Sequence, residues 1–397
     1  MAVEVDSDNL ARVINALVSY ELDALVCSLP SHVLLLTGYE PVIGNAVAVF
    51  TQRGGVHLLV PEDEAEMAAE TSYANQLTFR PRSLNAITDS NQSVALPLLQ
   101  LLKKLGLERS QLGLEMYGLQ HPASYLSQHR YGDSLQSLIA DEFRSIRLLS
   151  ADQLLQRLCA VKTKPQIDGL RISCDLAGMA FKQAARSWQI GMTEPEVANV
   201  FQSAYGRVTA ERNISRTQAQ FFCMSGENAG KANAAFAMTR QRVIRQGDTV
   251  LIHCNSNVNG YWTGITRTYI RGERSLKHRQ MVDAIANARS AGLDAIAPGV
   301  AASEVDMAAR TLLTNRGFGD LYTHATGHGV GFGPANSNAF PRIHPKSPDV
   351  LEAGMTFTLQ PAIYLGDLGG MRHCDVVAVT GTGVDILTDF QSPETDR

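Results

Sequence analysis

Hydrophobic residues in roughly the first 150 positions follow two alternating patterns. Short apolar runs, many of them β-branched and bounded by turn residues, predict strands, and they lie at 24–27, 33–36, 46–50 and 55–60. Residues 9–20 and 93–105 place apolar side chains at the 3.6-residue spacing of an amphipathic helix. Strands and helices that alternate in this way predict an α/β domain with a mixed sheet.

Helix start and stop signals punctuate the rest of the chain. Pro165 suits the first turn of a long helix that we expect to run through Trp188. Thr193 and Glu196 form a capping box, in which each side chain accepts a hydrogen bond from the other residue's backbone N–H. Gly317 has the place of a C-cap glycine that ends a further helix.

Strand-like runs are interleaved with these helices, at 249–254, 266–271, 355–362 and 375–380. Their order beside the helices predicts an α+β fold for the second part of the chain. A domain boundary is expected near 148–164, which gives an N-terminal domain at 1–155 and a C-terminal domain at 156–397.

Composition narrows the classes of function. The 397 residues, 45% hydrophobic and 19% charged, describe a globular protein of two domains. The formal net charge is −4 and no Lys/Arg-rich block is present, so nucleic acid is not an expected partner. No apolar run approaches the ~20 residues of a membrane helix, and the acidic start at 1–8 is unlike a signal peptide. We therefore expect a cytoplasmic protein with no membrane partner and with reduced cysteines.

Sequence motifs in the second domain occur in the order of a known family. They lie at 245–255, 260–268, 323–331, 351–364 and 372–380. They resemble the core of the pita-bread hydrolases, which include creatinase, prolidase, aminopeptidase P and methionine aminopeptidase. The resemblance implies an α+β protein in which a C-terminal pita-bread domain follows an N-terminal creatinase-like α/β domain.

The resemblance also shows where metal ligands would be expected. Metal-dependent members of the family bind two divalent ions with Asp, Asp, His, Glu and Glu. The matching positions here are His253, Gly264, His328, Gln360 and Cys374. Two dications in one pocket need anionic oxygen ligands to offset their repulsion, so we expect no dinuclear site and no cofactor. The alternative is a single zinc ion held by His253, His328 and Cys374, because imidazole and thiolate are zinc ligands.

Creatinase resembles this chain at 260–264 and works without metal, which directs attention to the histidines. Imidazole titrates near neutrality and suits general acid–base catalysis. The catalytic candidates are His253, His324, His328 and His373, and the substrate-binding candidates are Phe236, Gln360, Tyr364 and Arg372. Phe236 matches a histidine that the family uses beside the scissile bond, and the Arg372 guanidinium suits a substrate carboxylate.

Each candidate also has a purely structural interpretation. His328 can be inherited from a metal-binding ancestor, His253 can fill vacated space, Cys374 can be inert packing, and Arg372 can brace the sheet. The function that we predict is metal-independent hydrolysis of a C–N bond in a small amide, amidine or N-substituted amino acid. The alternatives are a non-catalytic binding module and a mononuclear zinc hydrolase or peptidase. Relatives with this domain order are usually homodimers, so a homodimer is expected.

Overall fold

The computed structural model of the chain describes residues 4–42, 46–81, 84–85, 90–116, 134–214, 216–233, 237–334, 336 and 338–390. The chain divides into two compact units, Met1–Cys159 and Ala160–Arg397, which are described one at a time. Within the described residues, no helix is both long enough and apolar enough to cross a membrane.

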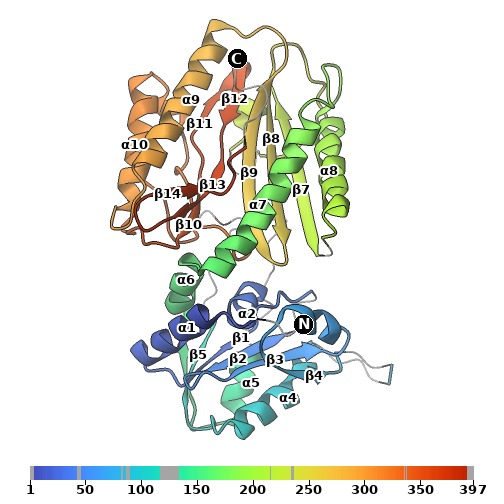
Figure 1. Cartoon of the computed structure of the whole chain (residues 1–397), viewed down its shortest axis with the longest axis vertical. Helices are drawn as coiled ribbons and strands as arrows, with labels where there is room; N and C mark the ends of the chain where they lie inside the picture. The colour runs from blue at the N-terminus through green and yellow to red at the C-terminus, as the bar shows by residue number, and fades with distance from the viewer. Residues whose placement is uncertain are drawn as a thin grey trace. The chain divides into compact units, whose positions relative to one another are not determined.

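The N-terminal unit is built on one mixed six-stranded sheet with the order β4-β3-β2-β1-β5-β6 (Figure 1). Its strands are β1 (Ala24–Cys27), β2 (Val47–Thr51), β3 (Val56–Pro61), β4 (Asn75–Phe79), β5 (Gln111–Leu114) and β6 (Arg147–Ser150). Its helices are α1 (Ser7–Ser19), α2 (Pro30–Thr37), α3 (Ala65–Thr71), α4 (Ser90–Lys104), α5 (Ser134–Glu142) and α6 (Asp152–Ala160). The mixed sheet confirms the α/β prediction for this region.

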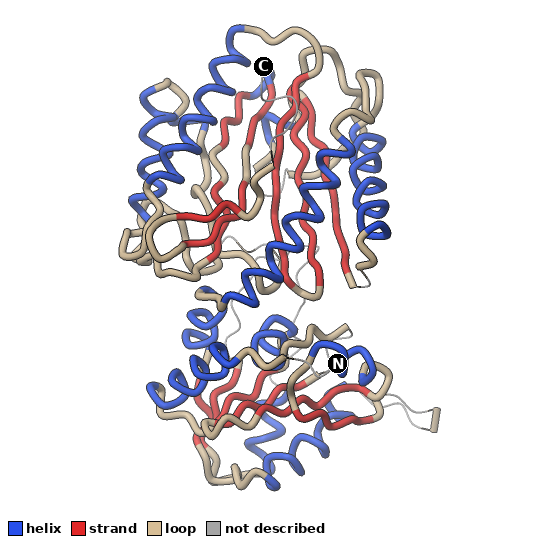
Figure 2. Tube along the Cα trace, viewed as in Figure 1, coloured by secondary structure: helices blue, strands red, loops and turns tan. Residues whose placement is uncertain are grey.

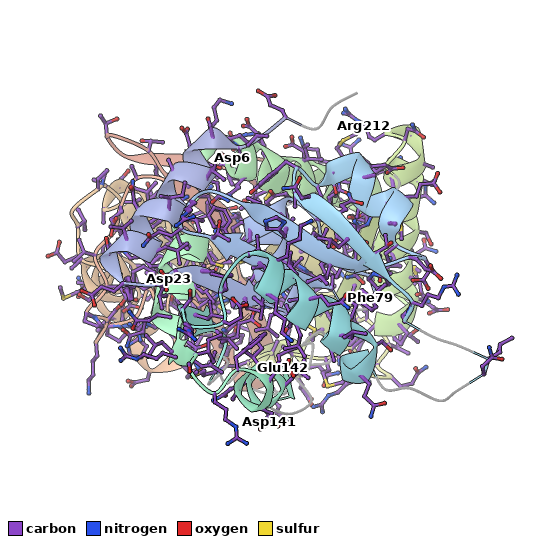
Figure 3. All side chains as sticks on the ribbon, turned by 90° about the horizontal axis from the view of Figure 1, so that it is seen from below. Asp6, Asp23, Phe79, Asp141, Glu142 and Arg212 are labelled. Atoms are coloured by element: carbon purple, nitrogen blue, oxygen red, sulfur yellow. The ribbon has the colours of Figure 1, made fainter. Side chains whose placement is uncertain are left out.

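Local chemistry accounts for the ends of the first two helices. The carboxylate of Asp6, labelled in Figure 3, accepts a hydrogen bond from the Asn9 backbone N–H and caps α1. Residues 33–36 were predicted to form a strand, and that prediction is wrong because they lie in α2. Pro30 at the first turn and Gly38, which takes a left-handed conformation after the last turn, define this helix. All four residues of the run are buried, so it has no alternating pattern that distinguishes helix from strand.

The C-terminal unit contains two three-stranded antiparallel sheets and a two-stranded hairpin (Figure 2). The strands are β7 (Thr217–Ser225), β8 (Thr249–Val258), β9 (Tyr261–Ile270), β10 (Thr356–Leu359), β11 (Ala362–Leu365), β12 (Gly369–Arg372), β13 (Asp375–Val379) and β14 (Val384–Ile386). The α-helices are α7 (Lys164–Ala184), α8 (Glu194–Glu211), α9 (Leu276–Asp294) and α10 (Ala302–Asn315). Helices α7 and α8 pack on the β7-β8-β9 sheet, and α9 packs beside β10, β11 and β12.

Most of the predicted helix start and stop signals in this unit are confirmed. Thr193 and Glu196 form the capping box that starts α8, and Gly317 adopts a positive φ of 78° after the end of α10. The strand predicted at 355–362 is interrupted, however, and becomes β10 and β11. Pro361 lies in the break, where its lack of an N–H prevents a continuous ladder. This break places Gln360 between two strands instead of within one.

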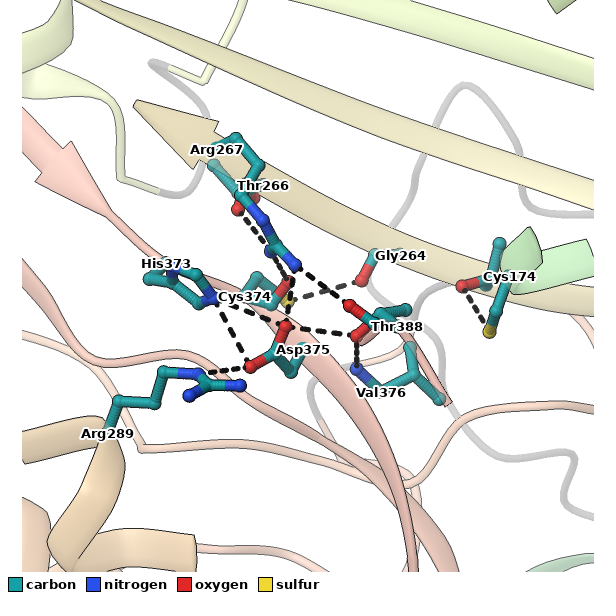
Figure 4. Close-up of polar contacts among 11 residues, drawn as sticks. Cys174, Gly264, Thr266, Arg267, Arg289, His373, Cys374, Asp375, Val376 and Thr388 are labelled. Carbon is teal, nitrogen blue, oxygen red and sulfur yellow. Dashed lines mark hydrogen bonds and ion pairs between the residues drawn. The ribbon is translucent and has the colours of Figure 1, made fainter. Parts of the chain in front are cut away.

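A buried carboxylate connects three elements of the C-terminal unit (Figure 4). Asp375, at the start of β13, accepts hydrogen bonds from Arg267 on β9 at 2.8 Å and from Arg289 on α9 at 2.5 Å. Side chains of Arg267 and Asp375 are 1% and 0% exposed. Burial opposes ionisation of Asp375, but His373 and the guanidinium groups of Arg267 and Arg289 outweigh it and hold the pKa of this carboxyl well below its usual range. Asp375 therefore stays ionised and ties β13 to β9 and α9.

Replacing Asp375 with Asn should strongly destabilise the C-terminal unit, because it leaves the buried Arg267 guanidinium and the partly exposed Arg289 guanidinium without this anion. We expect the free energy of unfolding to fall by about 3–5 kcal/mol. Urea unfolding can be followed by tryptophan fluorescence, since both tryptophans, Trp188 and Trp262, lie in this unit.

Asp385→Asn is the matched control. Asp385 pairs with Arg171, and these side chains are 42% and 37% exposed. Solvent screening limits such a pair to about 0–1 kcal/mol. Equal losses in the two variants would contradict the role assigned to Asp375.

Candidate functional site

Most of the selected residues that the structure describes gather where five segments of the C-terminal unit meet. These segments are the middle of β8 and β9, the loop at 322–331, the β10–β11 break and the end of β12. Main-chain contacts fix this arrangement: Cys374 pairs with Thr266 of β9, and Gly329 pairs with Phe357 of β10. Glycines are required where chains approach closely, since a Cβ on Gly327 would lie 1.7 Å from the Thr358 carbonyl oxygen.

Arg372, Tyr364 and His324 form one connected group. The Arg372 Nη1 donates to the Tyr364 hydroxyl at 3.5 Å, and that hydroxyl lies 3.0 Å from Nε2 of His324. The His324 Nδ1 lies 2.8 Å from the Ala325 carbonyl oxygen, which assigns the proton to Nδ1. Burial and the nearby Arg372 lower the pKa of His324 to about 4. His324 is therefore a neutral acceptor for the tyrosine hydroxyl at pH 7.

His253 and His328 lie next to the same guanidinium. Burial first, and then Arg372, lower the pKa of His253 to about 3 and lower that of His328 in the same direction. The Nδ1 of His328 lies 3.0 Å from the Gly329 carbonyl oxygen, so the Nδ1–H tautomer leaves Nε2 as an unprotonated acceptor. The site thus combines one permanent cation with three neutral imidazoles.

Thr266 links the guanidinium to His253, a role that sequence analysis missed. Its hydroxyl lies 2.9 Å from Nδ1 of His253 and 3.1 Å from Nε of Arg372. A signal was available: Thr266 lies two residues after Gly264 on the same strand, so both residues face the same side of the sheet.

One predicted site residue, His373, does not join this group. His373 points to the buried ion-pair cluster of Figure 4, where its Nε2 lies 3.2 Å from Asp375. Strand alternation explains the difference, because Arg372 and Cys374 face one side of the chain and His373 faces the other. Phe236 lies outside the described residues. Gln360 lies in the β10–β11 break, where its backbone N–H donates to the Thr326 carbonyl.

The positions that match metal ligands carry little negative charge. A Cβ on Gly264 would meet only the Asn255 Oδ1, at 3.5 Å, so the space of a missing side chain stays open. The Cys374 thiol donates to the Gly264 carbonyl, and burial raises its pKa to about 12. Together with the Gln360 amide and two neutral imidazoles, these residues do not fit a pair of dications, and the adjacent Arg372 adds a further positive charge.

Comparison with known proteins places the chain. Residues 168–381 match the sequence family described as metallopeptidase family M24. Residues 9–158 match the family described as the creatinase/prolidase N-terminal domain. The chain belongs to metallopeptidase family M24. It is similar to the Xaa-Pro dipeptidase of Pyrococcus furiosus, with 26% identity over 381 residues that cover 96% of this chain and 97% of the relative.

Solved structures share the fold of this M24 protein. The prolidase from Pyrococcus furiosus has a TM-score of 0.74 at 25% identity and covers 95% of this chain and 99% of its own. The Xaa-Pro dipeptidase from Bacillus anthracis has a TM-score of 0.77 at 22% identity, with coverage of 98% and 99%. The predicted pita-bread fold with an N-terminal creatinase-like domain is confirmed.

Family membership corrects the prediction about cofactors. We expected no cofactor, with a single zinc ion as the alternative, and this prediction is contradicted because the chain belongs to a family of metallopeptidases. The structure agrees with the sequence only in that the residues at the ligand positions do not fit the usual metal pair. We assign no chemical step to a metal at this site. The cytoplasmic location and the homodimer stay predictions.

The open space at Gly264 leads to a stability prediction. Gly264→Ala should leave the free energy of unfolding unchanged or raise it by up to about 1 kcal/mol, since the new methyl group meets no clash and a strand glycine is entropically costly. Gly327→Ala is the matched comparison and should destabilise by about 1–3 kcal/mol or more. Urea unfolding followed by tryptophan fluorescence measures both, and a destabilised Gly264→Ala variant would show that the space is filled.

Proposed function

We propose that this M24 protein hydrolyses the C–N bond of a small substrate that carries a carboxylate, such as an Xaa-Pro dipeptide or a related N-acyl amino acid. Its similarity to Xaa-Pro dipeptidases along almost the whole chain supports the reaction class. The observation that carries the substrate class is the environment of Arg372.

The Arg372 side chain carries a buried positive charge. The residue is 9% exposed, and among the residues that the structure describes no carboxylate forms an ion pair with it. Its contacts are the Thr266 hydroxyl, the Tyr364 hydroxyl and, through its backbone, Thr268. A buried guanidinium is stabilised strongly by a carboxylate, which it can bind through two parallel hydrogen bonds. A substrate carboxylate supplies the missing charge.

The imidazoles supply the proton chemistry. Cleavage of a C–N bond by water requires a base that accepts a proton from the water and an acid that protonates the leaving nitrogen. The Nε2 of His328 is the available acceptor, because its Nδ1 is committed to the Gly329 carbonyl. A carboxylate on Arg372 would also offset the guanidinium charge that lowers the pKa of this histidine, and so would strengthen it as a base.

A non-catalytic binding module is the second candidate. The observation in its favour is the replacement of the family's four ligand carboxylates, by His253, Gly264, Gln360 and Cys374. Such a module would bind the same carboxylate ligand through Arg372 but would not turn it over. Binding and turnover must therefore be measured separately.

The proposal predicts that activity depends on the Arg372 charge and geometry. Xaa-Pro dipeptides and N-acyl amino acids, each with a free or an amidated carboxyl group, would be screened by mass spectrometry with and without added Mn²⁺ or Zn²⁺. We expect turnover of the free acids only, and a loss of about 100-fold or more in kcat/KM for Arg372→Gln, equivalent to ~3 kcal/mol.

Two control variants separate chemistry from folding. Arg316→Gln changes an exposed arginine and should leave kcat/KM unaltered. His328→Gln should lower kcat while ligand binding, measured by calorimetry, is retained. Equal turnover of acids and amides would contradict the assignment of Arg372, and carboxylate binding without any turnover would favour the binding module.

A further inference from the structure

A cluster of reactive side chains lies in the N-terminal unit, whereas the residues of the candidate active site belong to the C-terminal unit. Its members are Cys27 at the end of β1, His32 in α2, Glu115 directly after β5, and Cys159 in α6. Atoms of Cys27, His32 and Glu115 that could bind a metal all lie within 4.8 Å of one another. The proposed C–N hydrolysis gives none of these residues a role.

His32 bridges a carboxylate and a thiol. Its Nδ1 lies 2.6 Å from Glu115 Oε1, and the imidazole also hydrogen-bonds the Cys159 side chain. Because Nδ1 is occupied by the carboxylate, Nε2 is the nitrogen left for the sulfur. A thiol on one imidazole nitrogen and a carboxylate on the other is the arrangement that orients a histidine beside a cysteine nucleophile.

Backbone groups hold the carboxylate end of this arrangement in place. Glu115 accepts hydrogen bonds from the backbone N–H groups of Ser28 at 2.9 Å and Leu29 at 3.0 Å, directly before α2. The side chain is 1% exposed. A carboxylate with this many donors cannot rotate freely, so its hydrogen bond to Nδ1 fixes the orientation of the His32 imidazole.

Charge supports the same interpretation. Burial disfavours a charged imidazole, but the hydrogen bonds to Cys159 and Glu115 outweigh it and raise the pKa of His32 to about 10. Burial also opposes ionisation of Glu115, yet the contact with His32 holds the pKa of that carboxyl below its usual value. His32 is therefore an imidazolium at neutral pH, and an adjacent positive charge stabilises a thiolate.

We propose that Cys159 is a nucleophilic thiol, oriented through His32 and Glu115, that reacts with hydroperoxides and other small soft electrophiles. Exposure separates it from the other thiols of the chain: Cys159 is half-buried, whereas Cys27, Cys174, Cys223, Cys254 and Cys374 are buried. Burial raises the pKa of Cys174 and Cys374 to about 12, which keeps these thiols protonated and unreactive.

The reaction with a hydroperoxide balances with the groups present. The Cys159 sulfur attacks the terminal oxygen of the peroxide, an S–O bond forms and the O–O bond breaks. The sulfur is oxidised to a sulfenic acid and the peroxide is reduced to an alcohol, or to water in the case of hydrogen peroxide. The leaving oxygen takes its proton from the His32 imidazolium, which becomes neutral.

A metal ion at this cluster is less consistent with the distances. Two ligands bound to the same tetrahedral zinc at about 2.0–2.1 Å lie roughly 3.3 Å apart. The 2.6 Å between His32 Nδ1 and Glu115 Oε1 is instead the length of a charge-assisted hydrogen bond. The cluster is organised around a proton between these two atoms.

Alkylation of the intact full-length protein tests the proposal. The native chain would be treated with iodoacetamide between pH 6 and 8.5, and each cysteine peptide would be quantified by mass spectrometry. At pH 6.5 we expect Cys159 to react at least about tenfold faster than N-acetylcysteine, which is only ~1% thiolate there. The buried cysteines of the same chain are internal controls and should stay unmodified. Hydrogen peroxide followed by dimedone should then label Cys159 as the sulfenic acid.

His32→Gln should slow the alkylation of Cys159 by about tenfold at pH 6.5, whereas His57→Gln, the same change elsewhere in this unit, should not. If His32→Gln fails to fold, the wild-type protein still decides, because the alkylation rate of Cys159 at pH 6.5 is compared directly with that of N-acetylcysteine and with those of the buried cysteines. A Cys159 that reacts no faster than N-acetylcysteine would overturn the proposal. So would one bound zinc per chain that blocks alkylation and is lost in Cys27→Ser.

Discussion

The candidate site depends on one buried carboxylate that is not part of it. Asp375 holds the Arg267 side chain on β9 and the Arg289 side chain on α9, and so fixes the start of β13 against both elements. The neighbouring residues Arg372 and Cys374 are positioned by the same strand segment, on its opposite side. Because a buried ion requires its partners in one geometry, this interaction holds in place the strand segment from which Arg372 contacts Thr266 and Tyr364.

Sequence patterns predicted the fold well where local and global preferences agree. The capping box at Thr193 and Glu196 and the strands at 249–254 and 375–380 were recognised because capping and apolar patterning point to the same element. The predicted secondary structure was wrong for 33–36, where complete burial removes the periodic pattern of apolar residues, and for 355–362, where Pro361 divides an apolar run. In both cases the deciding information is the tertiary environment or a single backbone N–H.

The site was predictable in its members but less so in its connections. Ordered motifs of the family were sufficient to select His253, His324, His328 and Arg372. The sequence could not tell that Thr266 joins two of them, nor that His373 belongs to the Asp375 cluster, because these facts depend on side-chain direction and distance. Arg372 is present while the family's neighbouring carboxylates are absent, so the electrostatic potential around it is positive. This potential and burial keep the imidazoles of His253 and His324 neutral, which no single motif indicates.

The cysteines show how strongly surroundings decide the chemistry of one residue type. Cys374 occupies a ligand position of the family, yet its thiol donates to the Gly264 carbonyl and burial keeps it protonated. Cys159 matches no family ligand position, but it is half-buried and contacts an imidazolium that a buried carboxylate holds in place. Thiol reactivity follows access and local charge. The physical basis for the proposed reactive cysteine therefore lies in the N-terminal unit, whereas the family's ligand motifs direct a search to the C-terminal unit.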